Sequence, residues 1–190
     1  MQQQWLPRAH NMEWMFSRVW WRTWSLRRFD VVTAYHVIEH VVDPMIFLVQ
    51  CRTLLRGDDR VILVTPNAGN FGHGRFGPCW RGLEVQRHLW IFTPGALKEC
   101  ARRAGLAECA LFTTSANAAT IVGVSRTIAR HGKFDPSRLS RGEKMDEWLR
   151  CPATALHARM HLLLDPRSGE EVCAILRPRA QESELSTVWE

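Results

Sequence analysis

The 190 residues, of which 46% are hydrophobic and 23% charged, suffice for one globular domain with a sizeable core. The 25 lysines and arginines give a net charge of +6 but never form a run of five, which argues against nucleic-acid binding. The longest unbroken aliphatic or aromatic stretch, residues 45–49, is far shorter than the roughly 20 residues of a spanning helix, so no membrane span is expected.

Residues 1–28 differ in composition from the rest of the chain. They hold five of the nine tryptophans and five arginines against a single acid, Glu13. Apolar residues recur at helical spacing between Met12 and Trp20, which predicts a short amphipathic helix. We expect this helix to pack on the domain's own apolar surface, and the alternative is that it lies on a membrane surface.

The six cysteines occur singly, without a C-x-x-C pair, and no hydrophobic signal segment precedes them. Such usage is typical of reduced thiols in the cytoplasm. We therefore expect a cytoplasmic protein.

A strand, helix, strand unit follows. Residues 29–35 are β-branched and nearly continuous, as in a strand buried on both faces of a parallel sheet, and residues 60–65 form a second such strand. Between them Asp43 can cap a helix with Pro44 at its first position, and Gly57 is expected to end it. The crossover rule makes this unit right-handed.

The remaining elements are less regular. Residues 68–92 contain five glycines and no clear period, as in a functional loop or a lid. Thr93 and Pro94 start a helix that Gly105 ends. We expect a strand at 109–113, a helix at 116–130, a helical stretch at 140–164 broken at Pro152, and a last strand at 171–176.

The run FDVVTAYHVIEHVVDP, residues 29–44, resembles the fourth strand and following loop of class I S-adenosylmethionine-dependent methyltransferases. Residues 54–57, 61–67, 87–94 and 104–106 match further segments in family order, and the resemblance is closest to the ubiquinone, menaquinone and small-molecule O-methyltransferase branch. It implies a partial doubly wound, mostly parallel, Rossmann-like α/β sheet with a helical insertion before the last strand. Residues 29–190 would then be the C-terminal half of such a domain, set apart from residues 1–28.

The resemblance also locates the cofactor. In the family, a glycine-rich turn after the first strand approaches S-adenosylmethionine, but this chain has no glycine before Gly57. What remains by resemblance is the loop after the fourth strand, which makes Ala34, Tyr35 and His36 the candidates for cofactor contact. Physical reasoning agrees, because ligands of open parallel sheets bind beyond the carboxyl ends of the strands.

Methyl transfer is an in-line displacement from a sulfonium, so the acceptor has to be held close and aligned. A base helps when the acceptor is a hydroxyl, and His88 and His40 are our candidates for that role. For each, the alternative is a histidine bonded to a loop carbonyl. Asn67, Arg87 and Trp80 are the candidates for binding the acceptor, although Asn67 equally fits a turn former after Pro66.

Two metal interpretations also arise from residues 36–40. They spell H-x-x-E-H, the signature of inverted zinc peptidases, but that geometry requires a long helix where the pattern leaves one turn. Some quinone-pathway relatives look to bind a divalent ion through two glutamates and a histidine in this loop. Here Glu39 and His40 are present, but His36 replaces the first glutamate, and hard cations prefer oxygen ligands. We therefore predict no metal, and the peptidase remains a remote alternative.

The sequence thus favours methyl transfer from S-adenosylmethionine to a small-molecule acceptor, by a truncated chain that is either weakly active or inactive. The alternative is a non-catalytic, methyltransferase-like remnant that serves as an interaction module or as half of a split enzyme. In the family the strand at 29–35 pairs with the first strand, so an apolar sheet edge would be exposed for self-association or for a partner.

Overall fold

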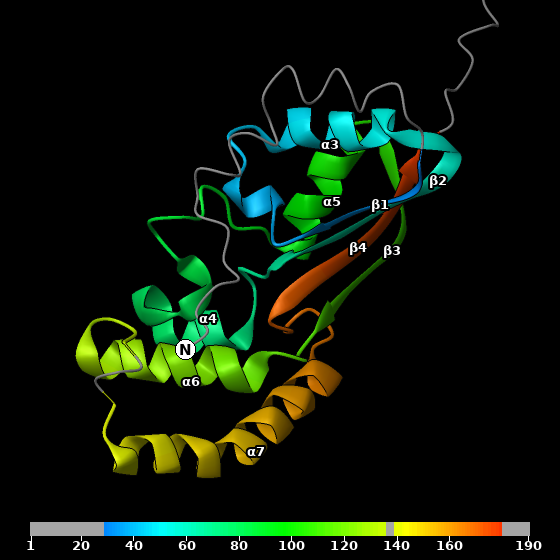
Figure 1. Ribbon diagram of the computed structural model, residues 1–190. Coiled ribbons are helices and arrows are strands. Elements are labelled where there is room, and N and C mark those ends of the chain that lie inside the picture. The colour runs from blue at the N-terminus through cyan, green and yellow to red at the C-terminus, as the bar shows by residue number, and fades with distance from the viewer. Residues whose placement is uncertain (1–28, 136–138, 180–190) are drawn as a thin grey trace, which may run out of the picture.

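The computed structural model describes residues 29–135 and 139–179, which build one sheet with its helices (Figure 1). Strands β1 (Phe29–Tyr35), β2 (Leu55–Pro66), β3 (Leu106–Thr114) and β4 (Glu171–Pro178) hydrogen-bond in the order β1-β2-β4-β3. Helices α3 (Pro44–Thr53) and α5 (Pro94–Arg103) cover one face, whereas α4 (Phe71–Phe76), α6 (Ala118–His131) and α7 (Arg141–Leu164) lie beyond one end of the strands. The predicted α/β class and the helical insertion before the last strand are confirmed. The helix expected within residues 1–28 lies outside the described residues.

Three of the four strands point in the same direction. β1 and β2 are parallel neighbours, while β4 lies between β2 and β3 and is antiparallel to both. The sheet is therefore more mixed in its pairings than the mostly parallel arrangement expected from the sequence. The physical reason is the α6 and α7 insertion, which begins and ends at the same end of the strands. Thr114 at the end of β3 pairs with Glu171 at the start of β4, so β4 has to run back.

The β1-α3-β2 unit starts its helix as the sequence predicts. Asp43 Oδ1 accepts hydrogen bonds from the backbone N–H groups of Met45 at 2.8 Å and Ile46 at 3.0 Å. The helix ends at Thr53 rather than at Gly57, because the chain already pairs with β1 from Leu55 onward. Gly57 lies inside β2 with a φ of +61°, a backbone conformation that glycine adopts without strain.

The core lies between the sheet and helices α3 and α5. β1 contributes one face only, since Val31 is 49% and Tyr35 59% exposed. The expectation that this strand is buried on both faces is wrong for the described residues, because α3 and α5 both pack on the opposite face. The core residues with no exposed surface are Ile38, Leu48, Val61, Leu63, Leu97, Val172 and Ala174.

Two segments differ from their predicted form. Residues 68–92 contain α4, capped by Asn70, and two 3-10 helices at Gly77–Cys79 and Arg81–Leu83, where no period was visible. Helix α7 runs without interruption through Pro152, where a break was predicted, and Figure 1 shows it bending along its length. None of the helices that the structure describes is both long and apolar enough to cross a bilayer.

Candidate functional site

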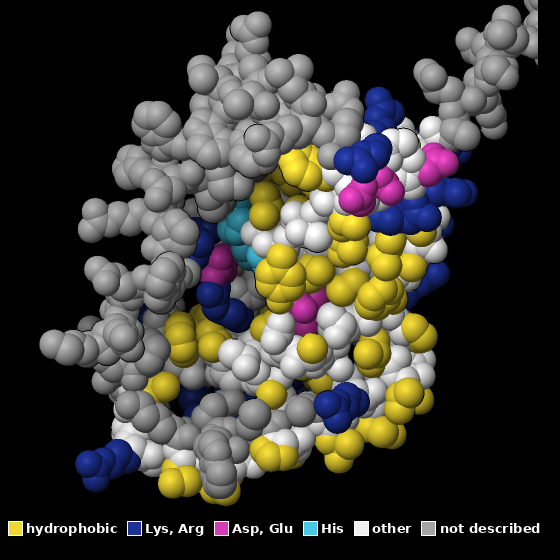
Figure 2. All heavy atoms as spheres, turned by 45° about the vertical axis from the view of Figure 1, so that its right-hand side comes forward, with side chains coloured by type: hydrophobic (Ala, Val, Ile, Leu, Met, Phe, Trp, Pro, Cys, Tyr) yellow, Lys and Arg dark blue, Asp and Glu magenta, His cyan; other side chains and the backbone are white. Residues whose placement is uncertain are grey.

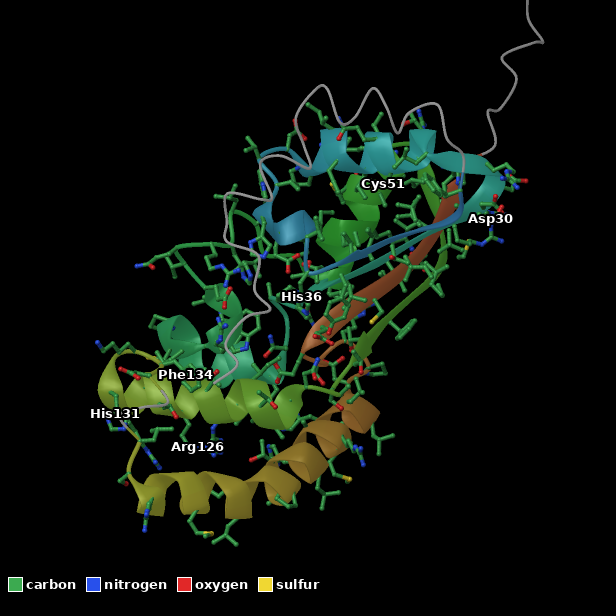
Figure 3. All side chains as sticks on the ribbon, in the orientation of Figure 1. Asp30, His36, Cys51, Arg126, His131 and Phe134 are labelled. Carbon is green, nitrogen blue, oxygen red and sulfur yellow. The ribbon has the colours of Figure 1, made fainter. Side chains whose placement is uncertain are left out.

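The carboxyl ends of β1, β2 and β3 meet at one edge of the sheet, where β4 begins. Tyr35, the last residue of β1, pairs with Val64 of β2, and Thr114 of β3 pairs with Glu171 of β4. The expectation that β1 and β2 end as parallel neighbours is therefore confirmed. Side chains that leave these strand ends gather at a common place, and Figure 3 shows His36 there.

His36 joins two carboxylates at this edge. Its Nδ1 lies 2.9 Å from Glu39 Oε1 and its Nε2 lies 3.0 Å from Glu171 Oε1. The residue has a φ of +51°, an uncommon left-handed conformation, and its backbone N–H donates to Val64 O at 2.9 Å. Glu39 and Glu171 are almost fully buried. We call His36, Glu39 and Glu171 the imidazole clasp.

The clasp is charged. Hydrogen bonds to Glu171 and then to Glu39 raise the pKa of His36 to about 9, although burial opposes the shift. Burial acts to raise the pKa of Glu39, but hydrogen bonds from His36, its own backbone N–H and Thr65 hold that pKa below its usual value. The pKa of Glu171 is likewise lowered, by His36 and Asn117, against its burial. At neutral pH the clasp therefore holds one imidazolium and two carboxylates, a net charge of −1.

Further polar side chains fix the clasp. Thr65 Oγ1 donates to Glu39 Oε2 at 2.9 Å. Tyr35 donates its hydroxyl to Glu171 Oε1 at 3.3 Å, and Asn117 Nδ2 donates to the same oxygen at 3.0 Å. Tyr35 remains 59% exposed, so the outer side of the clasp is open to a ligand.

The two histidines predicted as bases also come together. The rings of His40 and His88 lie 4.7 Å apart, although 48 positions separate them in the sequence. His40 Nδ1 contacts Arg87 O at 2.9 Å, and His88 Nδ1 contacts Gly82 O at 2.7 Å. Because a carbonyl oxygen only accepts, each Nδ1 carries a proton. Burial lowers the pKa of His88, which keeps that ring neutral.

Among the described residues, Glu39, His40 and His88 could hold a metal ion, since one ligand atom from each lies within 4.8 Å of the others. The Glu39 carboxylate is already engaged. Its Oε1 accepts from His36 and its Oε2 from Thr65, so a cation would compete with the imidazolium for the same negative charge. The peptidase alternative fails on geometry, because residues 38–40 form a single 3-10 turn instead of a long helix.

The other predicted site residues have different surroundings. Asn67 is fully buried, and its amide bonds the carbonyls of Arg167 and Gly169 and the N–H of Gly69, which fits the turn-forming alternative. Trp80 is 2% exposed and stacks on His73. Arg87 is exposed beside His40. Ala34 is buried in the core, so only its backbone can face a ligand.

Glu170 is a buried carboxyl, 2% exposed, that lies beside the indole of Trp80. Among the described residues, neither its Oε2 nor Trp80 Nε1 has a partner within hydrogen-bond geometry. Burial raises the pKa of Glu170 to about 7. The carboxyl lies against Gly72, where an added Cβ would meet Glu170 Oε1 at 3.0 Å.

Sequence reasoning missed Glu171, Asn117 and Thr65. Glu171 lies 135 positions from His36, and only the return of β4 to the sheet brings it there. One signal was available. Two adjacent acids, at 170 and 171, adjoin an apolar strand, and acids in such a position are rarely buried without partners. Asn117 carried no signal of its own.

Comparison with known proteins gives a family match over more than half of the chain. The pattern described as a methyltransferase domain matches residues 2–110. A ubiquinone biosynthesis O-methyltransferase from Cereibacter sphaeroides strain ATCC 17029 is 39% identical over 85 residues, which cover 42% of this chain and 34% of that protein. The enzyme of strain ATCC 17025 is 38% identical over the same share. The chain thus covers about a third of the length of these relatives.

Among solved structures, the chain is similar to a methyltransferase from Thermotoga maritima described as a possible histamine N-methyltransferase. The identity is 14% and the TM-score 0.48, over 80% of this chain and 57% of that one. A methyltransferase from Archaeoglobus fulgidus is 14% identical with a TM-score of 0.46, over 85% of this chain and 64% of that one.

Proposed function

The chain belongs to the methyltransferase domain family, and from that premise we propose that it takes part in S-adenosylmethionine-dependent methyl transfer to a small-molecule acceptor. The observation that supports this most is the convergence of three strand ends at the imidazole clasp, beside the histidine pair. The relatives from Cereibacter sphaeroides are O-methyltransferases, so a hydroxyl is the proposed acceptor. Because the chain spans about a third of their length, the activity of the whole protein is itself a proposal.

The cofactor supplies a methyl group on a positively charged sulfonium. We assign its contacts to the backbone of Ala34 and to Tyr35 and His36, at the tip of β1. The net charge of −1 on the clasp favours a cation bound at its open side. Tyr35 is more than half exposed and adjoins the clasp, so its ring can pack against that ligand.

His88 and His40 are the proposed bases. A hydroxyl that attacks a methyl group loses its proton, and a neutral imidazole Nε2 can accept it. The carbonyls of Gly82 and Arg87 hold the two rings through Nδ1, so Nε2 is the atom that we propose as the proton acceptor. His88 is nearly buried and its Nε2 lies 3.4 Å from Glu84 Oε2, whereas His40 is more accessible. We therefore propose His40 as the first candidate for accepting the proton and His88 as the second. No step of this proposal needs a metal ion.

A specific surface favours the second candidate function, an interaction module. β1 is an edge strand of the described sheet, and its outward residues Val31 and Tyr35 are exposed. Val42 and Ile46, just before and on α3, are 84% and 56% exposed nearby in the sequence. An apolar strand edge of this kind can pair with another chain that supplies further strands.

Isothermal titration of the purified chain with S-adenosylmethionine tests the first function. Binding in the micromolar range that weakens at least about tenfold in Tyr35→Ala, with no change in Phe112→Ala on β3, supports the proposal. Phe112 is a matched control because it is 51% exposed on the opposite edge strand. Absence of binding at millimolar ligand would leave the interaction module, which analytical ultracentrifugation of Val31→Arg then tests through loss of self-association.

A further inference from the structure

Resting on the proposed function, we infer that Glu171 is the residue by which this chain distinguishes S-adenosylmethionine from S-adenosylhomocysteine. The contacting atom is the second carboxylate oxygen of Glu171, Oε2. The two ligands differ by a methyl group and by the positive charge of the sulfonium, so a residue that separates them has to respond to charge. Glu171 thereby becomes a specificity-determining residue of the proposed cofactor site.

The two oxygens of Glu171 have unequal surroundings. Oε1 accepts hydrogen bonds from His36 Nε2 at 3.0 Å, from the Tyr35 hydroxyl at 3.3 Å and from Asn117 Nδ2 at 3.0 Å. No donor among the described residues bonds Oε2. Yet Oε2 is not one of the fully buried polar atoms that lack a partner in the described part of the chain. It therefore has solvent contact, although the residue as a whole is only 4% exposed.

This oxygen carries negative charge. Burial acts to raise the pKa of Glu171, but hydrogen bonds from His36 and then from Asn117 lower it below its usual value. Glu171 is therefore ionised at neutral pH, and the single imidazolium leaves the clasp with a net charge of −1. An ionised oxygen without a donor, in a residue that is mostly buried, costs free energy that a bound cation offsets.

The groups beside this oxygen suit a sulfonium. A sulfonium has no N–H or O–H, so negative charge and aromatic ring faces are what bind it. The ring of Tyr35 is 59% exposed, and its hydroxyl holds it beside Glu171. Figure 2 shows acidic surface among hydrophobic side chains near the middle of the molecule, and apolar surroundings strengthen the attraction between charges. The neutral sulfur of S-adenosylhomocysteine gains no such attraction.

Two substitutions change the charge of the clasp in opposite directions. Glu171→Gln removes one carboxylate and leaves the clasp neutral, with the His36 imidazolium paired to Glu39. His36→Gln removes the imidazolium and leaves two carboxylates, a net charge of −2. Both substitutions delete the ion pair between His36 and Glu171, so they share the structural effect of its loss. Their effects on charge have opposite signs.

The test is isothermal titration of the full chain and its variants with S-adenosylmethionine and with S-adenosylhomocysteine, at about pH 8 and low ionic strength. The measured quantity is the ratio of the Kd for S-adenosylhomocysteine to the Kd for S-adenosylmethionine. Because both ligands are titrated into the same variant, a general loss of affinity cancels in this ratio. Glu108→Gln is the matched control, since its carboxylate pairs with Lys98 near the start of β3, whereas the clasp adjoins the end of that strand.

We expect the ratio to fall about tenfold in Glu171→Gln, to rise in His36→Gln and to stay unchanged in Glu108→Gln. Added salt should lower the ratio of the unaltered chain, because it screens the attraction. If Glu171→Gln binds neither ligand, the rise in His36→Gln decides.

A ratio that is unchanged in Glu171→Gln while both ligands still bind overturns the inference and leaves the proposed function intact. A ratio that moves in the same direction in Glu171→Gln and His36→Gln also overturns it, because the lost ion pair is then responsible and not the charge. If the unaltered chain binds neither ligand, the proposed function fails and the inference fails with it.

Discussion

Replacing His36 by glutamine tests the charge state of the imidazole clasp. The folded-state pKa of His36, about 9, is raised above the ordinary value of 6.5, so its contribution to stability is complete below pH 6.5 and is lost as pH rises to 9. Between pH 7.5 and 9.5 this linkage amounts to about 2 kcal/mol. Since the side chain is 32% exposed, solvent screening reduces the expectation to about 1–2 kcal/mol.

The assay is urea unfolding of the unaltered chain and of His36→Gln at several pH values. The difference in unfolding free energy between them should shrink by about 1–2 kcal/mol from pH 7.5 to 9.5. Titrating groups that do not contact His36 are common to both proteins and cancel in the difference. Proton NMR of the His36 ring gives a direct reading of the same pKa. A difference that stays constant over this range, or a ring that titrates near 6.5, would refute the clasp as an ion pair.

Three further substitutions test packing and burial. Glu170→Gln should stabilise the chain by about 2–3 kcal/mol at pH 8.5 and have no effect at pH 4. The reason is that the pKa of the carboxyl is raised to about 7, so its ionisation costs free energy as pH rises from 4.5 through 7. Denaturation curves of both proteins at the two pH values check this. Gly82→Ala should cost about 1–3 kcal/mol in thermal unfolding, because its Cβ would meet the buried Trp80 ring at 2.3 Å, whereas Gly95→Ala, with nothing within 4 Å, should cost nothing. Leu63→Ala, in the centre of β2, should lower the unfolding free energy by about 2–5 kcal/mol, and a loss below 1 kcal/mol would mean that this core is loosely packed.

Local features of the chain were predictable because they depend on neighbours in sequence. Asp43 and Pro44 start α3, and Thr93 and Pro94 start α5, through capping contacts that span three residues. The alternation of strand and helix from residue 29 onward fixed the α/β class. At Pro152 the same rules predict a break, whereas α7 continues with a bend, because α6 packs on α7 and supports the helix.

The site residues likewise divide into those placed by local sequence and those placed by tertiary contacts. Residues 36–40 follow β1 directly, so the sequence alone identified His36, Glu39 and His40 as one loop beside the strand end. Tertiary structure decided their chemistry, since the return of β4 brings Glu171 to His36 and makes the imidazole the centre of an ion pair. The backbone N–H groups of Leu89 and Trp90 donate to Glu39 O, and this contact brings His88 to His40. Such contacts depend on the order and direction of strands in the sheet, which the identity of adjacent residues does not encode.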